Sequence, residues 1–324
     1  MKAIVCEAYG GPEVLALREL ADPPPPGPGE IQVRIGARGV QYVDVLMIAG
    51  KYQFRPEPPF IPGSEAAGVV TAVGSDVGNF RAGDRVMSRH ALGAFAEIGN
   101  AKAALCDRIP HAMSIEEAGV FRSAYTTAYH ALLQRGRLAA GEWVLVHGAA
   151  GGIGIAAIQV AKRFGAKVIA TASTEPKRAA CLEEGADHAI DYRGGFVDAV
   201  KDLTGGRGVD IVYDPIGDKV ADESLRCLAW GGRLLILGFL GGSPAHIRSN
   251  YLLIKGIDVV GVRIGGLNEA DPALAKANMK ALIELAAEGQ LKPRISHRLR
   301  LDQAAEALQA VIDRKVIGKA VLLS

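Results

Sequence analysis

Two kinds of hydrophobic pattern divide the chain. In the first third, apolar and polar positions alternate with a period of two in short runs such as Ile31–Ile35 and Ala67–Gly74. This period predicts strands that bury one face. The proline-rich segment 23–28 is incompatible with a helix or a central strand. We therefore expect a mostly β domain in this region.

From about Ser114 the pattern changes to apolar runs that alternate with amphipathic helical segments. Ser114 is a suitable N-cap for a helix over 115–133. The alternation beyond it predicts a parallel sheet covered by helices on both faces, that is, an α/β doubly wound domain. The expected strands are 144–147, 167–171, 210–213, 233–238 and 257–262, and the expected helices are 154–164, 175–185, 221–229, 272–288 and 303–313, before a closing strand over 319–323.

A small-residue loop follows the first of these strands. It reads A-x-G-x-x-G, and its phosphate-contacting residues are predicted to be Ala150, Gly151, Gly152, Ile153 and Gly154. A backbone without bulky side chains lets a pyrophosphate approach, and the start of the following helix offers free N–H groups. This order of strand, loop and helix predicts a Rossmann dinucleotide site. Because Ala149 stands where the first glycine is usual, we expect a slightly different turn.

The second strand of this unit indicates which nicotinamide cofactor binds. A site that prefers NAD usually ends this strand with an acidic residue, but residues 167–174 contain none. Lys177 and Arg178 follow instead, and cations suit a 2′-phosphate. We therefore predict NADPH as the cofactor. The alternative is that these two cations only lie on an exposed helix.

Composition narrows the function classes further. A chain of 324 residues predicts two domains, and a formal net charge of +2 without basic runs argues against nucleic acid or an acidic membrane as a partner. The four cysteines are widely spaced and show no C-x-x-C pair, so we expect reduced thiols in the cytoplasm. No leader or membrane span is expected.

Five segments in order along the chain carry a family resemblance: 39–44, 62–70, 82–86, 147–154 and 318–322. With them the chain resembles the zinc-free branch of the medium-chain dehydrogenase/reductases, the NADPH:quinone oxidoreductases that include zeta-crystallin. The resemblance implies a Rossmann NADPH-binding domain (121–264) inserted in a GroES-like catalytic domain (1–120 and 265–324). It also implies an active site in the interdomain cleft and a homodimer in which strand 257–262 pairs across the interface.

The same comparison implies that no metal is bound. Zinc-dependent relatives place Cys, His and Cys where this chain has Gln41, Ser64 and Ser123. An amide and two hydroxyls are poor Zn²⁺ ligands. Without a Lewis acid, alcohol oxidation loses its main catalyst, so alcohol dehydrogenase activity is not expected.

The resemblance also assigns site residues. It implies that Ser173, Lys177 and Tyr192 hold the 2′-phosphate and that Thr127 lies near the nicotinamide. Further cofactor contacts are expected from Gly217, Phe239, Leu240, Arg263 and Lys319. For Lys319 the alternative is a solvated lysine. For Arg263 the alternatives are an acidic or thioester-linked substrate and a surface ion pair.

For the substrate, the predicted catalytic residues are Gln41, whose amide could donate to a carbonyl, and Tyr42 and Tyr52 as lining groups. Packing or exposure is the alternative for each tyrosine. Leu46 stands where some relatives carry an aromatic residue. The leading function is hydride transfer from NADPH to a quinone. The alternatives are reduction of an activated C=C bond in an enone or enoyl thioester, with a tyrosine as proton donor, and a non-catalytic, crystallin-like NADPH-binding protein.

Overall fold

The computed structural model describes residues 1–324, and the chain forms two compact units. Unit 1 comprises Met1–Ser123 and Lys292–Ser324, and unit 2 comprises Ala124–Leu291. The segment 265–291, which the sequence analysis assigned to the GroES-like domain, lies in unit 2. The reason is visible in α9 (Pro272–Ala287), where Asn278 exchanges hydrogen bonds with Gln134 and Leu282 is buried.

Unit 1 is mostly β, as expected for a GroES-like domain. Its main sheet has the order β14-β15-β3-β4-β5-β7, with β6 also paired to β3, and a separate hairpin joins β1 to β2. The strands are β1 (Lys2–Cys6), β2 (Leu15–Glu19), β3 (Glu30–Val40), β4 (Glu65–Val73), β5 (Arg85–Arg89), β6 (Ile98–Lys102), β7 (Cys106–Arg108), β14 (Ile295–Arg300) and β15 (Lys319–Leu323). The helices are α1 (Tyr42–Ile48), the first part of α2 (Ile115–Tyr129), and α10 (Ala304–Ile312).

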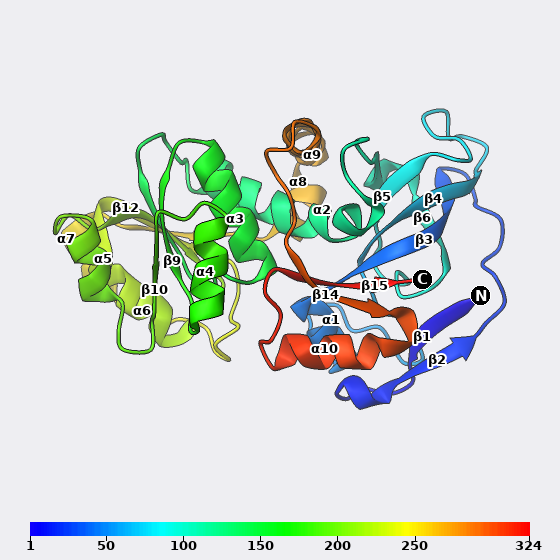
Figure 1. Cartoon of the computed structure of the whole chain (residues 1–324), viewed down its shortest axis with the longest axis horizontal. Helices are drawn as coiled ribbons and strands as arrows, with labels where there is room; N and C mark the ends of the chain where they lie inside the picture. Colours follow the sequence, from blue (N-terminus) through cyan, green and yellow to red (C-terminus); the bar gives the residue numbers. More distant parts are fainter. The chain divides into compact units, whose positions relative to one another are not determined.

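The last strand of the chain pairs with one of the first. Strand β15 lies antiparallel to β3, with Ala320 opposite Val40, so red and blue ribbons run side by side in Figure 1. The fully buried guanidinium of Arg38 on β3 donates to the Ser324 hydroxyl and to the Ala96 carbonyl. The chain end is therefore part of the core of unit 1.

Unit 2 is a Rossmann-type parallel sheet. The strand order β10-β9-β8-β11-β12-β13 has every neighbour parallel, with β8 (Trp143–Val146) near its centre. The other strands are β9 (Lys167–Thr171), β10 (His188–Ile190), β11 (Val209–Asp214), β12 (Leu228–Ile236) and β13 (Asp258–Gly261). The helices are α3 (Gly152–Arg163), α4 (Glu175–Glu183), α5 (Val197–Leu203), α6 (Asp218–Cys227), α7 (Ser249–Lys255), α8 (Ile264–Ala270) and α9.

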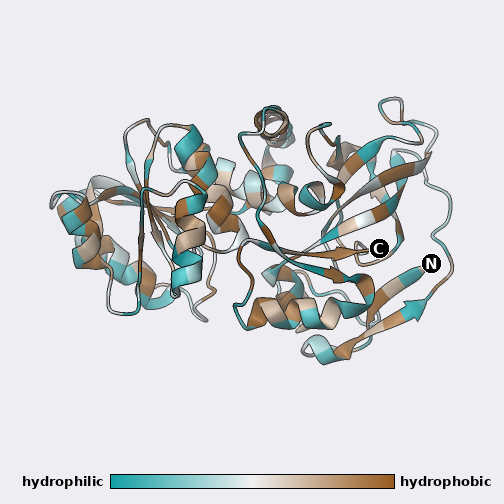
Figure 2. Cartoon of the chain, in the orientation of Figure 1, coloured by the Kyte–Doolittle hydropathy of each residue, from teal (hydrophilic) through white to brown (hydrophobic).

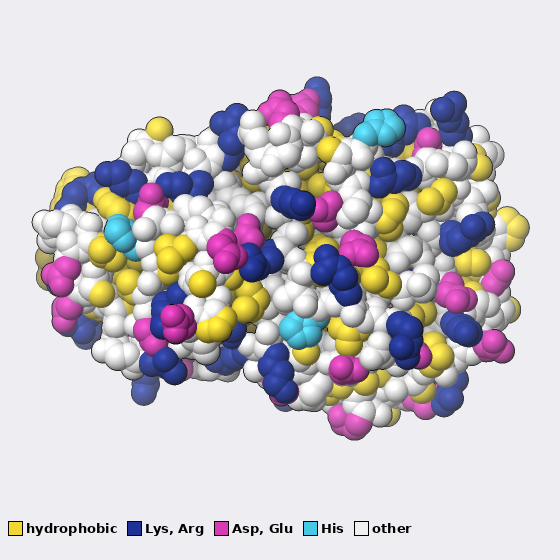
Figure 3. All heavy atoms as spheres, viewed as in Figure 1, with side chains coloured by type: hydrophobic (Ala, Val, Ile, Leu, Met, Phe, Trp, Pro, Cys, Tyr) yellow, Lys and Arg dark blue, Asp and Glu magenta, His cyan; other side chains and the backbone are white.

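Burial follows this layering. The strands of the parallel sheet are strongly hydrophobic, whereas the helices over them carry mixed faces (Figure 2). On the face seen in Figure 3, basic and acidic side chains are interspersed, and no single-sign patch dominates it. No helix combines the length and hydrophobicity needed to cross a lipid bilayer.

Candidate active site

In unit 1, three polar side chains from distant parts of the sequence form one hydrogen-bonded group. Gln41 follows β3 and precedes α1, Ser64 precedes β4, and Ser123 lies on α2. The Ser123 hydroxyl donates to Gln41 Oε1 (2.9 Å), and Gln41 Nε2 donates to Ser64 Oγ (3.2 Å). We call these residues the amide–hydroxyl group. They are the three residues that the sequence analysis placed where zinc-dependent relatives carry ligands, and the fold brings them into hydrogen-bonding distance of one another.

A buried ion pair lies directly beside this group. Lys319 Nζ donates to Glu65 Oε1 (2.9 Å), and the backbone N–H of Ser123 donates to Glu65 Oε2 (2.9 Å). Both charged side chains are almost fully buried. Sequence reasoning missed Glu65, although it follows Ser64 directly. Lys319, predicted to contact a pyrophosphate, has its ammonium at this carboxylate in the structure.

A second buried carboxyl adjoins Gln41. Asp44 Oδ2 accepts from the Gln41 N–H (2.8 Å), while Oδ1 has no hydrogen-bond partner. Burial raises the pKa of Asp44 to about 7; the Gln41 N–H and the Lys319 charge lower it, and the Glu65 charge raises it further. A carboxyl with one unpartnered oxygen in such surroundings fits a neutral, protonated group near pH 7.

The two predicted tyrosines are not part of the amide–hydroxyl group, although Tyr42 follows Gln41 directly in the chain. Tyr42 is the first residue of α1 and is 39% exposed, whereas Tyr52 packs against the core cluster that contains Phe60. Neither hydroxyl hydrogen-bonds to Gln41. Leu46 on α1 is half-buried. Of the predicted catalytic residues, only Gln41 is joined to other polar groups of the site.

In unit 2, the glycine loop has the geometry of a phosphate-binding turn. Gly148, rather than the residue at 149, adopts the left-handed conformation (φ 58°), which explains how Ala149 is tolerated there. A Cβ on Gly154 would lie 2.5 Å from the Gly148 carbonyl oxygen, so only glycine lets α3 pack this close. The N-cap residue Gly151 provides no side-chain cap, which leaves the first N–H groups of α3 available to an anion.

The buried side chain of His147, which precedes this loop, links it to β9 and α6. Its Nδ1 is 3.0 Å from Thr171 Oγ1 and its Nε2 is 2.9 Å from Ser224 Oγ. Because the Ser224 hydroxyl donates to the Val220 carbonyl, it accepts from Nε2–H, which fixes the neutral tautomer. Burial lowers the pKa of His147 to about 3. Both ring nitrogens are used, so the role of this histidine is structural.

The residues predicted to hold a 2′-phosphate come from neighbouring elements. Ser173 lies two residues beyond β9, and Tyr192 lies two residues beyond β10. These strands pair in parallel with Thr171 opposite Ile190. Ser173 and Tyr192 therefore both lie just beyond the carboxyl ends of two neighbouring strands. Lys177 occupies the first turn of α4 and is half-buried.

Two arginines lie near Tyr192: Arg178, which the sequence analysis named with Lys177, and Arg193, which it did not. Arg193 and Arg178 both bind the carboxylate of Asp191. Hydrogen bonds from Arg193, aided by the charges of Arg193 and Arg178, hold the pKa of Asp191 far below its usual value. Arg178 and Arg193 are close in space because β9 and β10 pair. The sequence analysis predicted no strand over 188–190, so it could not predict this proximity.

Three of the residues predicted to lie near the nicotinamide, Gly217, Phe239 and Leu240, are close to one another. A Cβ on Gly217 (φ 71°) would lie 2.9 Å from the ring of Phe239, and Leu240 N donates to the Pro215 carbonyl. Asp214 Oδ1 accepts from the N–H groups of Ile216 and Gly217 and fixes this turn. Burial raises the pKa of Asp214 to about 6 despite these bonds.

For two further residues predicted to contact the cofactor, Thr127 and Arg263, the structure gives only their place and exposure and, for Arg263, an ion pair. Thr127 is half-buried on α2, four residues beyond Ser123. Arg263 precedes α8 and is exposed, with its guanidinium 3.7 Å from Glu269, which matches the surface ion pair considered as its alternative.

Comparisons with known proteins agree with both units. Residues 27–134 match the family described as alcohol dehydrogenase GroES-like domain, and residues 152–286 match the family described as zinc-binding dehydrogenase. The chain is 37% identical over 323 residues to quinone oxidoreductase-like protein 2 of Mus musculus, covering 99% of this chain and 91% of that protein. It is 32% identical over 326 residues to human quinone oxidoreductase, covering 100% and 98%.

A solved structure extends the similarity to three dimensions. Escherichia coli quinone oxidoreductase complexed with NADPH superposes with a TM-score of 0.93 at 32% identity, and the match covers the full length of both chains. The motifs of the sequence, the two folds and these relatives lead to one assignment. The chain belongs to the quinone oxidoreductase family of the medium-chain dehydrogenase/reductases.

Proposed function

We propose that the protein is an NADPH-dependent reductase that delivers hydride to a quinone without a metal ion. The observation that carries this proposal is the amide–hydroxyl group. Gln41 Oε1 accepts from Ser123, which orients the amide, and Nε2 uses one of its two hydrogens for Ser64. The second N–H hydrogen of this half-buried amide is left to donate to a substrate carbonyl oxygen.

The dinucleotide surface of unit 2 fits the cofactor. The uncapped start of α3 suits a pyrophosphate, and Gly154 admits no side chain. Ser173, Lys177 and Tyr192, with Arg178 and Arg193 beside them, suit a 2′-phosphate. The solved relative in complex with NADPH supports the same assignment.

When bound, NADPH supplies the hydride. In this proposal the residues of the chain hold the acceptor and stabilise charge. Addition of hydride to the quinone leaves a hydroquinone anion, and the second N–H of Gln41 would donate to its oxygen. Water then supplies the proton that completes the hydroquinone. No ionisable side chain is required to transfer it.

The test is NADPH oxidation by the purified protein with 1,4-benzoquinone, 9,10-phenanthrenequinone, an enone and crotonyl-CoA, with NADH as the comparison cofactor. We expect turnover of the quinones with NADPH. Gln41→Leu should lower kcat/KM for quinones roughly 100-fold, whereas Gln53→Leu, at an exposed position, should leave it unchanged. Equal rates for Gln41→Leu and the native protein would refute the role of the amide.

A second candidate is reduction of an activated C=C bond. It is favoured by the aliphatic Leu46 on α1 and by Arg263, whose ion pair is exposed and long and therefore weak. Preference for crotonyl-CoA or the enone would support this candidate and make Tyr52→Phe the next variant. Absence of turnover with every acceptor, despite NADPH binding, would favour a non-catalytic binding protein.

We also propose a homodimer formed through β13. This strand ends the parallel sheet, and Val259 on it is 38% exposed. An unpaired edge with exposed apolar side chains is a surface that proteins usually cover.

A further inference from the structure

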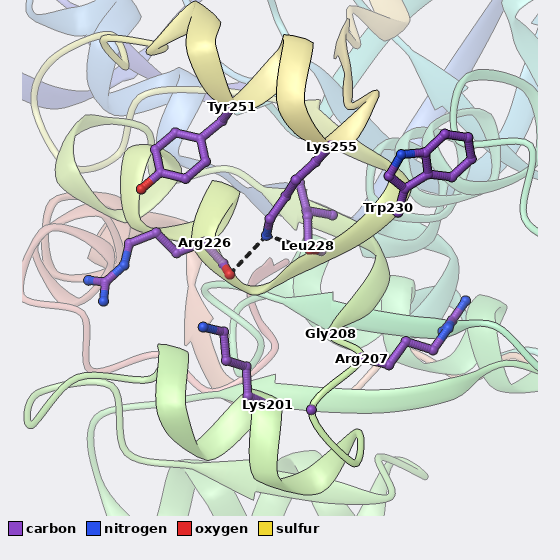
Figure 4. A pocket seen from close by; sticks show the side chains of 9 residues that line it. Lys201, Arg207, Gly208, Arg226, Leu228, Trp230, Tyr251 and Lys255 are labelled. Carbon is purple, nitrogen blue, oxygen red and sulfur yellow. Dashed lines mark hydrogen bonds between the residues drawn. The ribbon is translucent and has the colours of Figure 1, made fainter.

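A cavity of about 410 Å³ lies in unit 2, away from the glycine loop. It is bordered by Gly208, just before β11, and by Leu228, the first residue of β12 (Figure 4). The glycine loop follows the last residue of β8, and β8, β11 and β12 are parallel. The cavity therefore lies at the amino ends of these parallel strands, whereas the proposed dinucleotide site lies at their carboxyl ends.

The lining of this cavity is strongly basic. Four cationic and two aromatic side chains line it, and no carboxylate does; they are Lys201, Arg207, Arg226, Lys255, Trp230 and Tyr251. Lys201, Arg226 and Lys255 come from the last turns of α5, α6 and α7. Figure 4 shows the Lys201 and Lys255 side chains directed toward each other across the cavity. We call this site the basic pocket.

The four cations differ in what they can offer a ligand. Lys255 Nζ already donates to three backbone carbonyls, those of Leu225, Arg226 and Leu228. Arg207 is paired with Asp210. The side chains of Lys201 and Arg226, in contrast, form neither an ion pair nor a hydrogen bond. These two carry unused donors, while Lys255 contributes positive charge.

A purely structural explanation of the cations is that they stabilise the helix ends. Each helix C-terminus carries roughly half a negative charge. Three such ends and the Asp210 carboxylate offset only part of four positive charges, which leaves a net charge of about +1.5. Burial, and then the charge of Lys201, lower the pKa of Lys255, as expected where like charges face one another. The helix ends therefore do not account for the excess positive charge of the basic pocket.

The aromatic residues indicate a second feature of the ligand. Trp230 is 82% exposed, although burial of an indole is strongly favourable. An exposed tryptophan in the lining of a pocket that also holds two unpaired cations is suited to stack on a planar ring whose substituents are anionic. We propose that the basic pocket binds a nucleoside phosphate, with Lys201 and Arg226 at the phosphates and Trp230 against the base. This site is separate from the proposed NADPH site and does not depend on it.

Trp230 is itself a reporter for the test, because the chain has only two tryptophans. In a Trp143→Phe background, Trp230 emission is titrated with ADP, with pyrophosphate and with sulfate at constant ionic strength. We expect saturable binding of ADP and weaker binding of pyrophosphate. Lys201→Gln and Arg226→Gln should each raise the Kd for ADP about tenfold.

Two control variants distinguish the basic pocket from other sites. Lys280→Gln removes an exposed cation of α9, and Lys177→Gln alters the proposed NADPH site; both should leave the ADP titration unchanged. Loss of the response in Lys177→Gln but not in Lys201→Gln would overturn the proposal. The same holds if sulfate matches ADP, or if no titration saturates. Equal Kd values for ADP and pyrophosphate would overturn the stacking role of Trp230.

Discussion

At the scale of single residues, the site of unit 1 is a set of neutral donors and acceptors held by buried charges. Gln41 is oriented by two serines, and Ser123 is in turn held by Glu65, whose other oxygen binds Lys319. Removal of one member of a buried ion pair leaves the other charge uncompensated. The amide of Gln41 therefore depends on residues that come from β4 and β15.

Cofactor preference is a prediction at this scale. Lys177→Gln removes a cation from the proposed 2′-phosphate site, so the KM for NADPH should rise about tenfold while the KM for NADH stays the same. Steady-state rates with both cofactors measure the effect, and Lys280→Gln is the control. A parallel change for NADPH and NADH would mean that Lys177 does not contact the 2′-phosphate.

A second prediction concerns the pH dependence of stability. The pKa of Asp44 is about 7 in the folded protein, above the ordinary value of 3.8. The stabilisation from its neutral form is therefore fully present below pH 3.8 and is lost as the pH rises through about 7. Asp44→Asn has no such loss.

We therefore expect the free energy of unfolding of Asp44→Asn, relative to the native protein, to increase by roughly 1–4 kcal/mol between pH 4 and pH 8. Urea unfolding at a series of pH values measures this difference. Asp76→Asn, at an exposed position, is the control. Parallel curves for Asp44→Asn and the native protein would show that the carboxyl ionises normally.

At the scale of elements, the close approach of α3 to β8 is what makes the phosphate loop. The turn needs a left-handed residue at Gly148 and no side chain at Gly154. The helix contributes a buried face that includes Ile155 and Ile158. Loop conformation and helix position are thus set by the same two glycines.

Gly154→Ala tests this dependence. Its Cβ would meet backbone atoms of Gly148 and Ala149, which cannot move without displacing the loop. We expect a loss of about 1–3 kcal/mol in unfolding free energy together with weaker NADPH binding. Gly78→Ala, where the added Cβ meets open space, should change neither. Thermal unfolding and a cofactor titration give the two readouts.

Elements with a strong period were predictable from the sequence, and short ones were not. Strands β9 and β11 and helix α9 agree within one residue with 167–171, 210–213 and 272–288, because long apolar runs and helical periods define them. Strand β12 begins at residue 228, so the predicted helix over 221–229 was wrong at its end and the predicted strand over 233–238 began too late. Strand β10 has three half-buried residues and gave no such signal. Missing it hid the neighbourhood of Tyr192, Asp191 and Arg193.

The same limit applies to the site. Gln41, Ser64 and Ser123 could be grouped only through the family resemblance, since 82 residues separate the first from the last. The burial that traps Lys319 against Glu65 is a property of the assembled sheet. Local sequence carries no information on such long-range pairing.

At the scale of the whole molecule, the exposed edge of the parallel sheet predicts association. Val259→Glu should convert the proposed dimer into a monomer, because a charge on β13 opposes edge pairing. Light scattering after size-exclusion chromatography measures the mass against 34.0 kDa for one chain. Val73→Glu, which alters an equally exposed valine of β4, is the control. A native protein that elutes as a monomer would end the proposal.

The pairing of β15 with β3 also sets an order of events during synthesis. Unit 2 is continuous in sequence and has all its strands once residue 291 has emerged, whereas unit 1 waits for its last 33 residues (292–324). At about 5–20 residues per second, β3 stays without β15 for roughly 15–60 s after it leaves the ribosome. During that time Glu65 lacks the charge of Lys319, and Arg38 lacks Ser324. The site of unit 1 is thus the last part of the molecule to be completed during synthesis, because Lys319 is made after all of unit 2.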